Sequence, residues 1–281
     1  MSLENSIKIV KNKRIKYKKR AVFVTALFIF FGISAFKITK NSFEYYDFIL
    51  MPVFLMLGLF FIFLIVIITT SYKNYYKNFF IKSLVNDMGF EFKEEFVLLD
   101  EDIKNLIFLN PISNGTDRIN GSFKGVKFQI FESVVAPKQD DNIIMTIFSC
   151  EFYKNFKTKT VCVDKKIFSK YFDKTDTPHK IILDNVDFND KFMVYSTDKI
   201  EAKYLLSFGF MERILNLSKN VAGFIFIKNK FYLFMAGRDK FEGNIFKNDV
   251  NFKKAKEYQD EILEILGIIK ELNLTLKIYK L

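Results

Sequence analysis

Histidine is nearly absent from this sequence of 281 residues, and the common motifs of nucleotide-binding and hydrolytic enzymes are missing. His179 is the only histidine, which excludes H-E-x-x-H zinc sites and leaves any Ser-His triad to one residue. It follows Pro178 in the polar stretch DKTDTPHK, so we expect it in a surface loop without a special role. None of the 11 glycines forms G-x-G-x-x-G or G-x-x-x-x-G-K-[ST], and there is no G-x-S-x-G elbow.

Cysteine is also scarce. Cys150 and Cys162 do not make a disulfide framework, and they suit a reducing compartment. We expect both to be small buried residues on strands, since a zinc site would need two more soft ligands. The acidic clusters Asp100–Asp102 and Asp140-Asp141 lack the spacing of a calcium loop. The sequence therefore predicts no cofactor, no metal site and no catalytic residue.

Acidic residues are scarce at the N-terminus, where most of the net charge of +11 lies. Residues 1–20 carry eight Lys and Arg against one acid, Glu4, and the other 261 residues carry only +4. Positive charge beside an apolar run is typical of the cytoplasmic side of a membrane span. A DNA-binding domain would need its basic face on the folded part, so nucleic acid is not an expected partner.

Two long apolar runs are present and uncharged. Ala21–Phe36 has 16 residues and can be extended by Lys37 and Ile38, while Phe48–Thr70 has 23. We interpret them as a transmembrane hairpin over residues 21–70, with spans at about 21–38 and 48–70. A cleaved secretory signal is the alternative for the first run, although Phe36-Lys37 makes a poor cleavage site.

The charge distribution predicts a multi-pass protein of the inner (cytoplasmic) membrane with both termini in the cytoplasm. Residues 1–20 would then be a basic cytoplasmic tail and 71–281 a cytosolic domain. We expect membrane lipids as partners of the residues at the interface, which are Arg20, Lys37, Tyr45, Tyr46, Tyr72, Lys73, Tyr76 and Lys77.

The segment Ser71–Gly89 has apolar residues at helical spacing and Gly89 as a stop. It is either a continuation of the second span that packs on the domain, which we favour, or an interfacial helix against anionic headgroups. Strand-like runs follow at Phe123–Val135, Asn142–Tyr153 and Lys159–Asp164, and Val221–Ile227 with Lys230–Ala236 predicts a tight hairpin.

Two helices should lie before this hairpin, capped by Asp198 (with Glu201) and by Ser207. A long helix over Asn251–Leu272 is expected to pack on the core; its apolar spacing also fits a short seam in a homo-oligomer. LTLKIYKL would close the chain as a strand. Because strands and helices come in groups, the predicted fold is α+β with a mainly antiparallel sheet and packed helices, after an N-terminal two-helix transmembrane hairpin.

The stretch VYSTDKIEAKYLLSFGFMERILNL (Val194–Leu217) resembles the signature of a bacterial family of unknown function, DUF3137. The resemblance extends to FYKNFKTKTV, to NKFYLFMA and to ILGIIKELNL, and so from about Phe123 to the C-terminus. Ser207-Phe208 replaces the family's usual Thr-Pro, and Thr158 replaces a glycine. The matching signature residues are Val194, Tyr195, Ser196, Asp198, Glu201, Ala202, Tyr204, Leu205, Leu206, Phe210, Met211, Glu212 and Arg213.

The resemblance implies an uncharacterised bacterial membrane protein with two N-terminal spans, sometimes encoded beside LemA-like membrane proteins. It transfers no catalytic residue. Another membrane protein, such as a LemA-like one, is thus an expected partner, and Glu201, Glu212 and Arg213 are its candidate contacts. Our main hypothesis is an interaction or scaffold module at the membrane. A lipid-binding module and an enzyme acting on a membrane-proximal substrate remain as alternatives.

Overall fold

A computed structural model describes residues 2–41, 46–99, 103, 112–135, 143–152, 155–166, 179–217, 221–237, 241 and 243–276. The chain forms two compact units. Unit 1 comprises residues 1–87 and 241–256, and unit 2 comprises residues 88–240 and 257–281. The division differs from the predicted one, because residues 1–20, 71–87 and 241–256 pack with the apolar helices rather than standing apart or joining the sheet.

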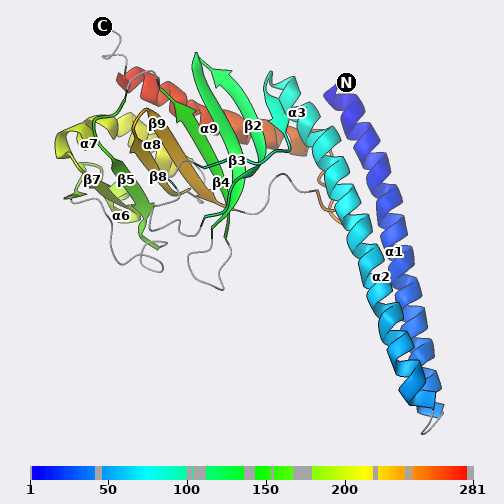
Figure 1. Ribbon diagram of the computed structural model, residues 1–281. Coiled ribbons are helices and arrows are strands. Elements are labelled where there is room, and N and C mark those ends of the chain that lie inside the picture. The colour runs from blue at the N-terminus through cyan, green and yellow to red at the C-terminus, as the bar shows by residue number, and fades with distance from the viewer. Residues whose placement is uncertain are drawn as a thin grey trace. The chain divides into compact units, whose positions relative to one another are not determined.

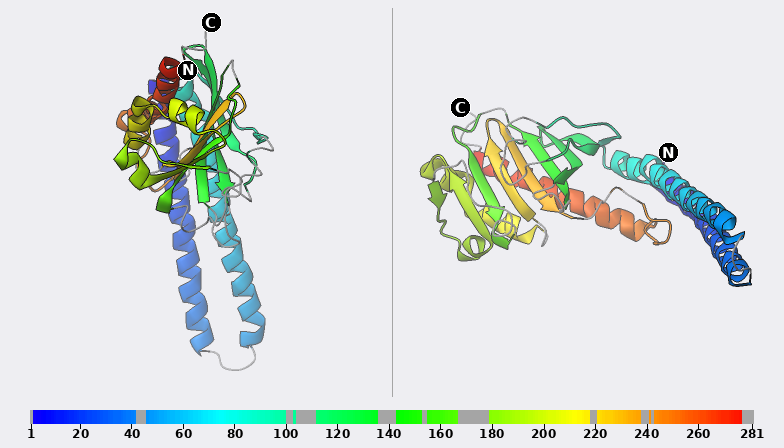
Figure 2. Two further views of the ribbon diagram at one scale, coloured as in Figure 1. Left: turned by 90° about the vertical axis from the view of Figure 1, so that its left-hand side faces the viewer. Right: turned by 60° about the horizontal axis from the view of Figure 1, so that its bottom comes forward.

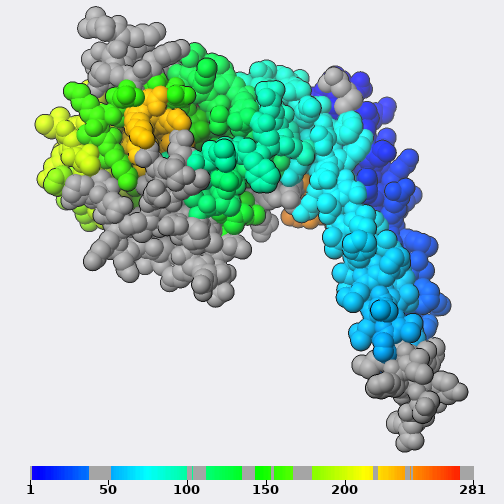
Figure 3. Space-filling view, in the orientation of Figure 1, coloured from blue at the N-terminus to red at the C-terminus, as the bar shows by residue number. Residues whose placement is uncertain are grey.

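Unit 1 is built on two long antiparallel helices (Figures 1 and 3). Helix α1 runs from Leu3 to Asn41, and α2 from Tyr46 to Tyr76. The second helix continues through one π-helical turn, η1 (Lys77–Ile81), into α3 (Lys82–Asp87). Both apolar runs lie in helices long and apolar enough to cross a membrane, and only 6% of each is buried in protein. The chain is therefore a membrane-associated protein.

The two helices stay paired well beyond their apolar runs. The rings of Phe28 and Phe61 are 6.1 Å apart within those runs, and those of Tyr17 and Tyr72 are 5.8 Å apart after them. Ser6 and Ser83 share a buried hydrogen bond of 2.6 Å between their hydroxyls. We call this paired extension, Leu3–Arg20 with Ser71–Asp87, the stalk. It adds about 26 Å of helix to the apolar pair.

Within the basic segment 1–20, Leu3–Arg20 therefore form the first half of α1. Ile7 and Val10 point into the core of unit 1, whereas the lysines of the segment are exposed. Ser71–Gly89 continues the second apolar helix, as favoured from its sequence, and Gly89 ends it with a φ of 79°. The remaining part of unit 1, Phe241–Lys256, packs against the stalk, and we call it the strap.

Unit 2 is a nine-stranded, wholly antiparallel sheet in the order β1-β2-β3-β4-β9-β8-β5-β7-β6, with helices among its strands (Figures 1 and 2). The α+β prediction is therefore confirmed. The strands are β1 (Glu91–Lys93), β2 (Thr116–Phe123), β3 (Val126–Val135), β4 (Ile143–Glu151), β5 (Thr160–Asp164), β6 (His179–Ile181), β7 (Phe192–Ser196), β8 (Val221–Ile227) and β9 (Lys230–Ala236). The helices are α6 (Val186–Lys191), α7 (Lys199–Leu205), α8 (Phe208–Asn216) and α9 (Phe252–Leu276), the last of which starts in the strap.

One face of the sheet is covered by α8 and α9. Phe210 of α8 packs edge-on against Phe224 and Phe231 of the central strands, with ring centres 5.4 and 6.0 Å away. Because side chains alternate along a strand, Tyr232 and Phe234 lie on the opposite face. That face has its own apolar cluster, which is built on Phe131, Ile147, Ile225 and Phe234 and also includes Val97, Leu99 and Ile103.

The structure corrects three sequence predictions. The run Phe123–Val135 is not one strand, because a turn at Lys124-Gly125, both with positive φ, separates β2 from β3. His179 begins the edge strand β6 rather than lying in a loop, and its side chain is exposed as expected. Residues 274–276 of the expected closing strand continue α9, and residues 277–281 lie outside the described part.

Candidate functional site

The predicted membrane-interface residues differ in how far they are exposed. Arg20 and Lys37 of α1 are exposed, and Lys73 and Lys77 are half-buried. The side chains of Tyr72 and Tyr76 are 1% exposed, so both pack inside unit 1. Tyr45 and the side chain of Tyr46 lie outside the described part.

Burial raises the pKa of the Tyr72 phenol well above its ordinary value, with the nearby Arg14 opposing the shift. The phenol therefore stays neutral, as expected for a ring in a protein core.

The signature residue Glu201 holds a turn of the neighbouring chain. Asp198 caps α7 by accepting hydrogen bonds from the amides of Ile200 (2.7 Å) and Glu201 (3.2 Å), as predicted. The Glu201 carboxylate turns away from the cap and accepts from the Lys157 amide at 3.1 Å and from the Thr158 hydroxyl. Thr158 is the residue that replaces a glycine of the family, and its hydroxyl makes this contact.

Glu212 and Arg213 also have partners within unit 2. Glu212 accepts a hydrogen bond of 2.9 Å from Asn185, whose own side chain caps α6. The Arg213 guanidinium crosses to α9 and donates to the backbone carbonyl of Glu264 at 2.7 Å. It lies over Gly267, where a Cβ atom would come within 2.0 Å of its Nη2. The glycine in the middle of α9 thus makes room for the arginine.

These contacts give the family signature a structural role. Its charged side chains tie α7 to the turn at Lys157-Thr158, and they tie α8 to the start of α6 and to α9. All three side chains are half-buried. Their role in binding a partner stays a prediction.

The two cysteines are buried thiols inside unit 2. Cys150 and Cys162 are buried on β4 and β5, as predicted, and burial raises the pKa of both thiols well above the ordinary value.

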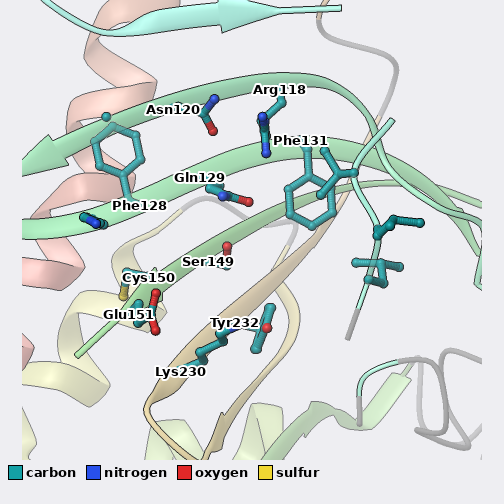
Figure 4. Close-up of a pocket in the computed structure, with 15 residues that line it drawn as sticks. Arg118, Asn120, Phe128, Gln129, Phe131, Ser149, Cys150, Glu151, Lys230 and Tyr232 are labelled. Carbon is teal, nitrogen blue, oxygen red and sulfur yellow. The ribbon is translucent and has the colours of Figure 1, made fainter. Parts of the chain in front are cut away.

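A cavity of about 320 Å³ opens on the face of the sheet opposite α8 (Figure 4). We call this face the cavity face. Strands β2, β3, β4 and β9 form its floor, and Val97–Leu99 form one wall. The strand register aligns four polar side chains directly across the floor, namely Asn120, Gln129, Ser149 and Tyr232.

The polarity of the cavity floor changes along the strands, from one set of residues in register to the next. The row Lys127, Glu151 and Lys230 lies on one side of the polar row and carries charge. On the other side, Phe131 lies in register with Ile147 and Phe234, which belong to the apolar cluster. The cavity thus has a charged row at one end, and at the other end the apolar ring of Phe131 with Arg118 on the same side of the polar row.

Two polar atoms at the cavity have no hydrogen-bond partner among the described residues. They are Nε of Arg118, a donor, and Oδ1 of Asn120, an acceptor, and both are buried. The Nη2 atom of Arg118 forms an ion pair with Glu95, and Glu151 accepts a hydrogen bond of 2.7 Å from the Asn229 side chain. Buried polar groups are paired in nearly all native structures, so an unpaired donor beside an unpaired acceptor indicates water or a ligand.

The sequence did not point to these residues. Asn120, Gln129, Ser149 and Tyr232 come from four strands and share no motif. The available signal was weak: polar residues at the alternate positions of otherwise apolar strands. The clusters Asp100–Asp102 and Asp140-Asp141 lie outside the described part.

Residues 146–274 match the model of a family described as a protein of unknown function, DUF3137, as the resemblance implied. No curated protein matches the chain. Among solved structures, the crystal structure of the mycobacterial trehalose monomycolate transport factor A, TtfA, covers 65% of this chain and 92% of its own. The identity is 13% and the TM-score is 0.40, a similarity too low to carry an argument about function.

Proposed function

Because residues 146–274 match a family described as of unknown function, we propose a role from the structure itself. The protein is a membrane-anchored binding module. Its apolar helix pair spans the inner membrane with both termini in the cytoplasm, and its sheet unit binds a partner group in the cavity. The observation that carries this proposal is the unpaired donor and acceptor, Arg118 Nε and Asn120 Oδ1, buried at the cavity.

The lining defines the chemistry of the bound group. Two lysines and one acid line the charged end, and a third base, Arg118, lies on the Phe131 side of the polar row. The excess of bases over acids favours an anionic group. Val97, Leu99 and Phe131 suit a short apolar stem at the other end. A carboxylate or phosphate carried on a hydrocarbon stem has both parts. The signature residues Glu201, Glu212 and Arg213 hold the unit together in this proposal, and the interaction surface lies elsewhere.

The binding part is tested with three probes on the purified full-length chain in detergent. Hexyl phosphate carries both features, inorganic phosphate only the charge, and hexanol only the stem. A ligand that binds the folded state alone raises its unfolding temperature. We expect a rise with hexyl phosphate, little with the other two, and none with hexyl phosphate for Ser149→Leu, which blocks the floor. Equal responses of Ser149→Leu and the unaltered chain would refute the site.

The membrane part is tested separately. The full-length chain should stay with vesicles in alkaline carbonate, and a phosphatase fused to the C-terminus should be inactive because it remains inside the cell. Release by carbonate, or an active C-terminal phosphatase, would contradict the anchoring and leave the binding result standing.

The hypothesis that a LemA-like membrane protein is the partner fits this proposal if such a protein presents an acidic, partly apolar segment. Crosslinking in cells from Leu98, which is 79% exposed at the cavity wall, tests it against crosslinking from Ile200, which is 82% exposed on α7. A partner captured only from Leu98 supports binding at the cavity, whereas capture only from Ile200 places the interaction on the signature helices.

A further inference from the structure

The whole net charge of the chain lies in unit 1. Its residues include 17 Lys and Arg and six Asp and Glu, which gives +11, whereas unit 2 has 26 of each and is neutral. Residues 1–20 supply most of this positive charge. The end of the second long helix and the strap add the rest, because folding brings Ser71–Asp87 and Phe241–Lys256 beside this segment.

The strap lies near the end of the apolar helices. Gly243 faces the ring of Tyr76, where a Cβ atom would be only 2.4 Å from the ring, and the Arg14 guanidinium donates to the carbonyl of Lys247. Arg14 precedes Arg20, the base immediately before the first apolar run, by six residues, or about 9 Å along the helix. The headgroup layer of a bilayer is about 5 to 8 Å thick on each side. With the apolar helices inserted, the backbone of Lys247 would lie about 1 to 4 Å beyond the outer limit of that layer.

The strap presents an apolar side chain at this level. Ile245 and Val250 are buried in unit 1, at 3% and 0% exposure, and hold the strap in place. Phe246 follows Ile245 and is 58% exposed, next to the exposed Lys247. An aromatic ring beside a base is the pairing found where proteins contact the membrane interface.

We propose that the strap is a third membrane-contacting element of the protein. Phe246 enters the interfacial layer, and Lys247, with the exposed bases Lys19 and Arg20 of α1, holds the phosphate of an anionic phospholipid. The proposal rests on the proposed insertion of the two apolar helices. It predicts contact with lipid from a segment some 170 residues further along the chain than the second apolar run.

The chain contains no tryptophan, so a single Phe246→Trp substitution gives a specific fluorescent reporter. The full-length variant is reconstituted in vesicles with and without brominated acyl chains. Phe30→Trp, 64% exposed on the first apolar run, is the control for helix insertion, and Phe208→Trp, 68% exposed on α8, is the control for a site away from lipid.

We expect blue-shifted emission and strong loss of intensity in brominated vesicles for Phe246→Trp and Phe30→Trp, and neither for Phe208→Trp. Water-like, unquenched emission from Phe246→Trp with a quenched Phe30→Trp would overturn the strap proposal alone. If Phe30→Trp were also unquenched, the anchoring itself would be refuted.

The charge is tested by native mass spectrometry of the full-length chain with equal amounts of anionic and zwitterionic phospholipid. Each base near a membrane surface contributes about fivefold to anionic preference, so Lys247→Gln should lower the ratio of anionic to zwitterionic adducts about fivefold. Lys180→Gln, on the exposed edge strand β6, should leave it unchanged. If excess inorganic phosphate removed the preference, the bases would bind free phosphate and the lipid assignment would be wrong.

Discussion

Replacing Asn120 by leucine separates the stability of the sheet unit from its binding function. Oδ1 of Asn120 is buried without a hydrogen-bond partner among the described residues. An unsatisfied buried polar group costs about 1–3 kcal/mol, and leucine has a similar size and shape without that cost. We therefore expect Asn120→Leu to stabilise unit 2 by about 1–2 kcal/mol while abolishing the response to hexyl phosphate.

The two cysteines provide an assay specific to unit 2. Cys150 and Cys162 are buried there, and unit 1 has none. A thiol-reactive fluorogenic dye added during heating consequently reports the unfolding of unit 2 alone. A gain of 1 kcal/mol raises the midpoint by about 2–4 °C for a chain of 150–250 residues.

Asn185→Leu is the matched control. Asn185 has both ends of its amide paired, with the Phe188 amide and with Glu212, so its loss should lower the midpoint. A comparable fall for Asn120→Leu would mean that Asn120 has a structural partner. That result would refute the reasoning from the unpaired atom.

Three further predictions follow from the packing of unit 2. Gly223→Ala should destabilise unit 2 by about 3 kcal/mol or more, because the Cβ of the alanine would lie 2.4 Å from the Cys162 carbonyl oxygen in a central strand. The dye assay should show a large fall in the unfolding midpoint, and an unchanged midpoint would contradict this prediction. Gly267→Ala should lower the unfolding midpoint in spite of the better helix propensity of alanine, because the new methyl group displaces Arg213 from the Glu264 carbonyl. In an Arg213→Ala background the same change should be neutral or stabilising. Equal effects in both backgrounds would disprove the coupling between Gly267 and Arg213. Because burial raises the pKa of both thiols, the thiols of the unfolded state lose their protons first as the pH rises past about 8.5. The free energy of unfolding should therefore fall above that pH by up to about 1.4 kcal/mol per pH unit for each thiol. Circular dichroism melts of a Cys150→Ala and Cys162→Ala double variant should show a flatter dependence on pH, and an identical slope would contradict this prediction.

The sequence by itself determined the features that depend on near neighbours in the chain. The two apolar runs become paired helices because an uncharged run of that length is stable only as a helix shielded from water. Asp198 and Ser207 begin α7 and α8 because each side chain reaches amides two or three residues ahead. The β8–β9 hairpin follows from two apolar runs separated by Lys228-Asn229, where Lys228 adopts a positive φ.

The tertiary structure decided what no local pattern could. The polar row from Asn120 to Tyr232 exists only in the register of four strands, and a shift by one residue would send those side chains to the other face. The hydrogen-bond partners of Glu201, Glu212 and Arg213 lie 27 to 51 residues away, so no local pattern identified them. The collection of all the net charge in one unit has the same origin, because packing joins three segments that the chain keeps far apart, and charge acts through space rather than along the sequence.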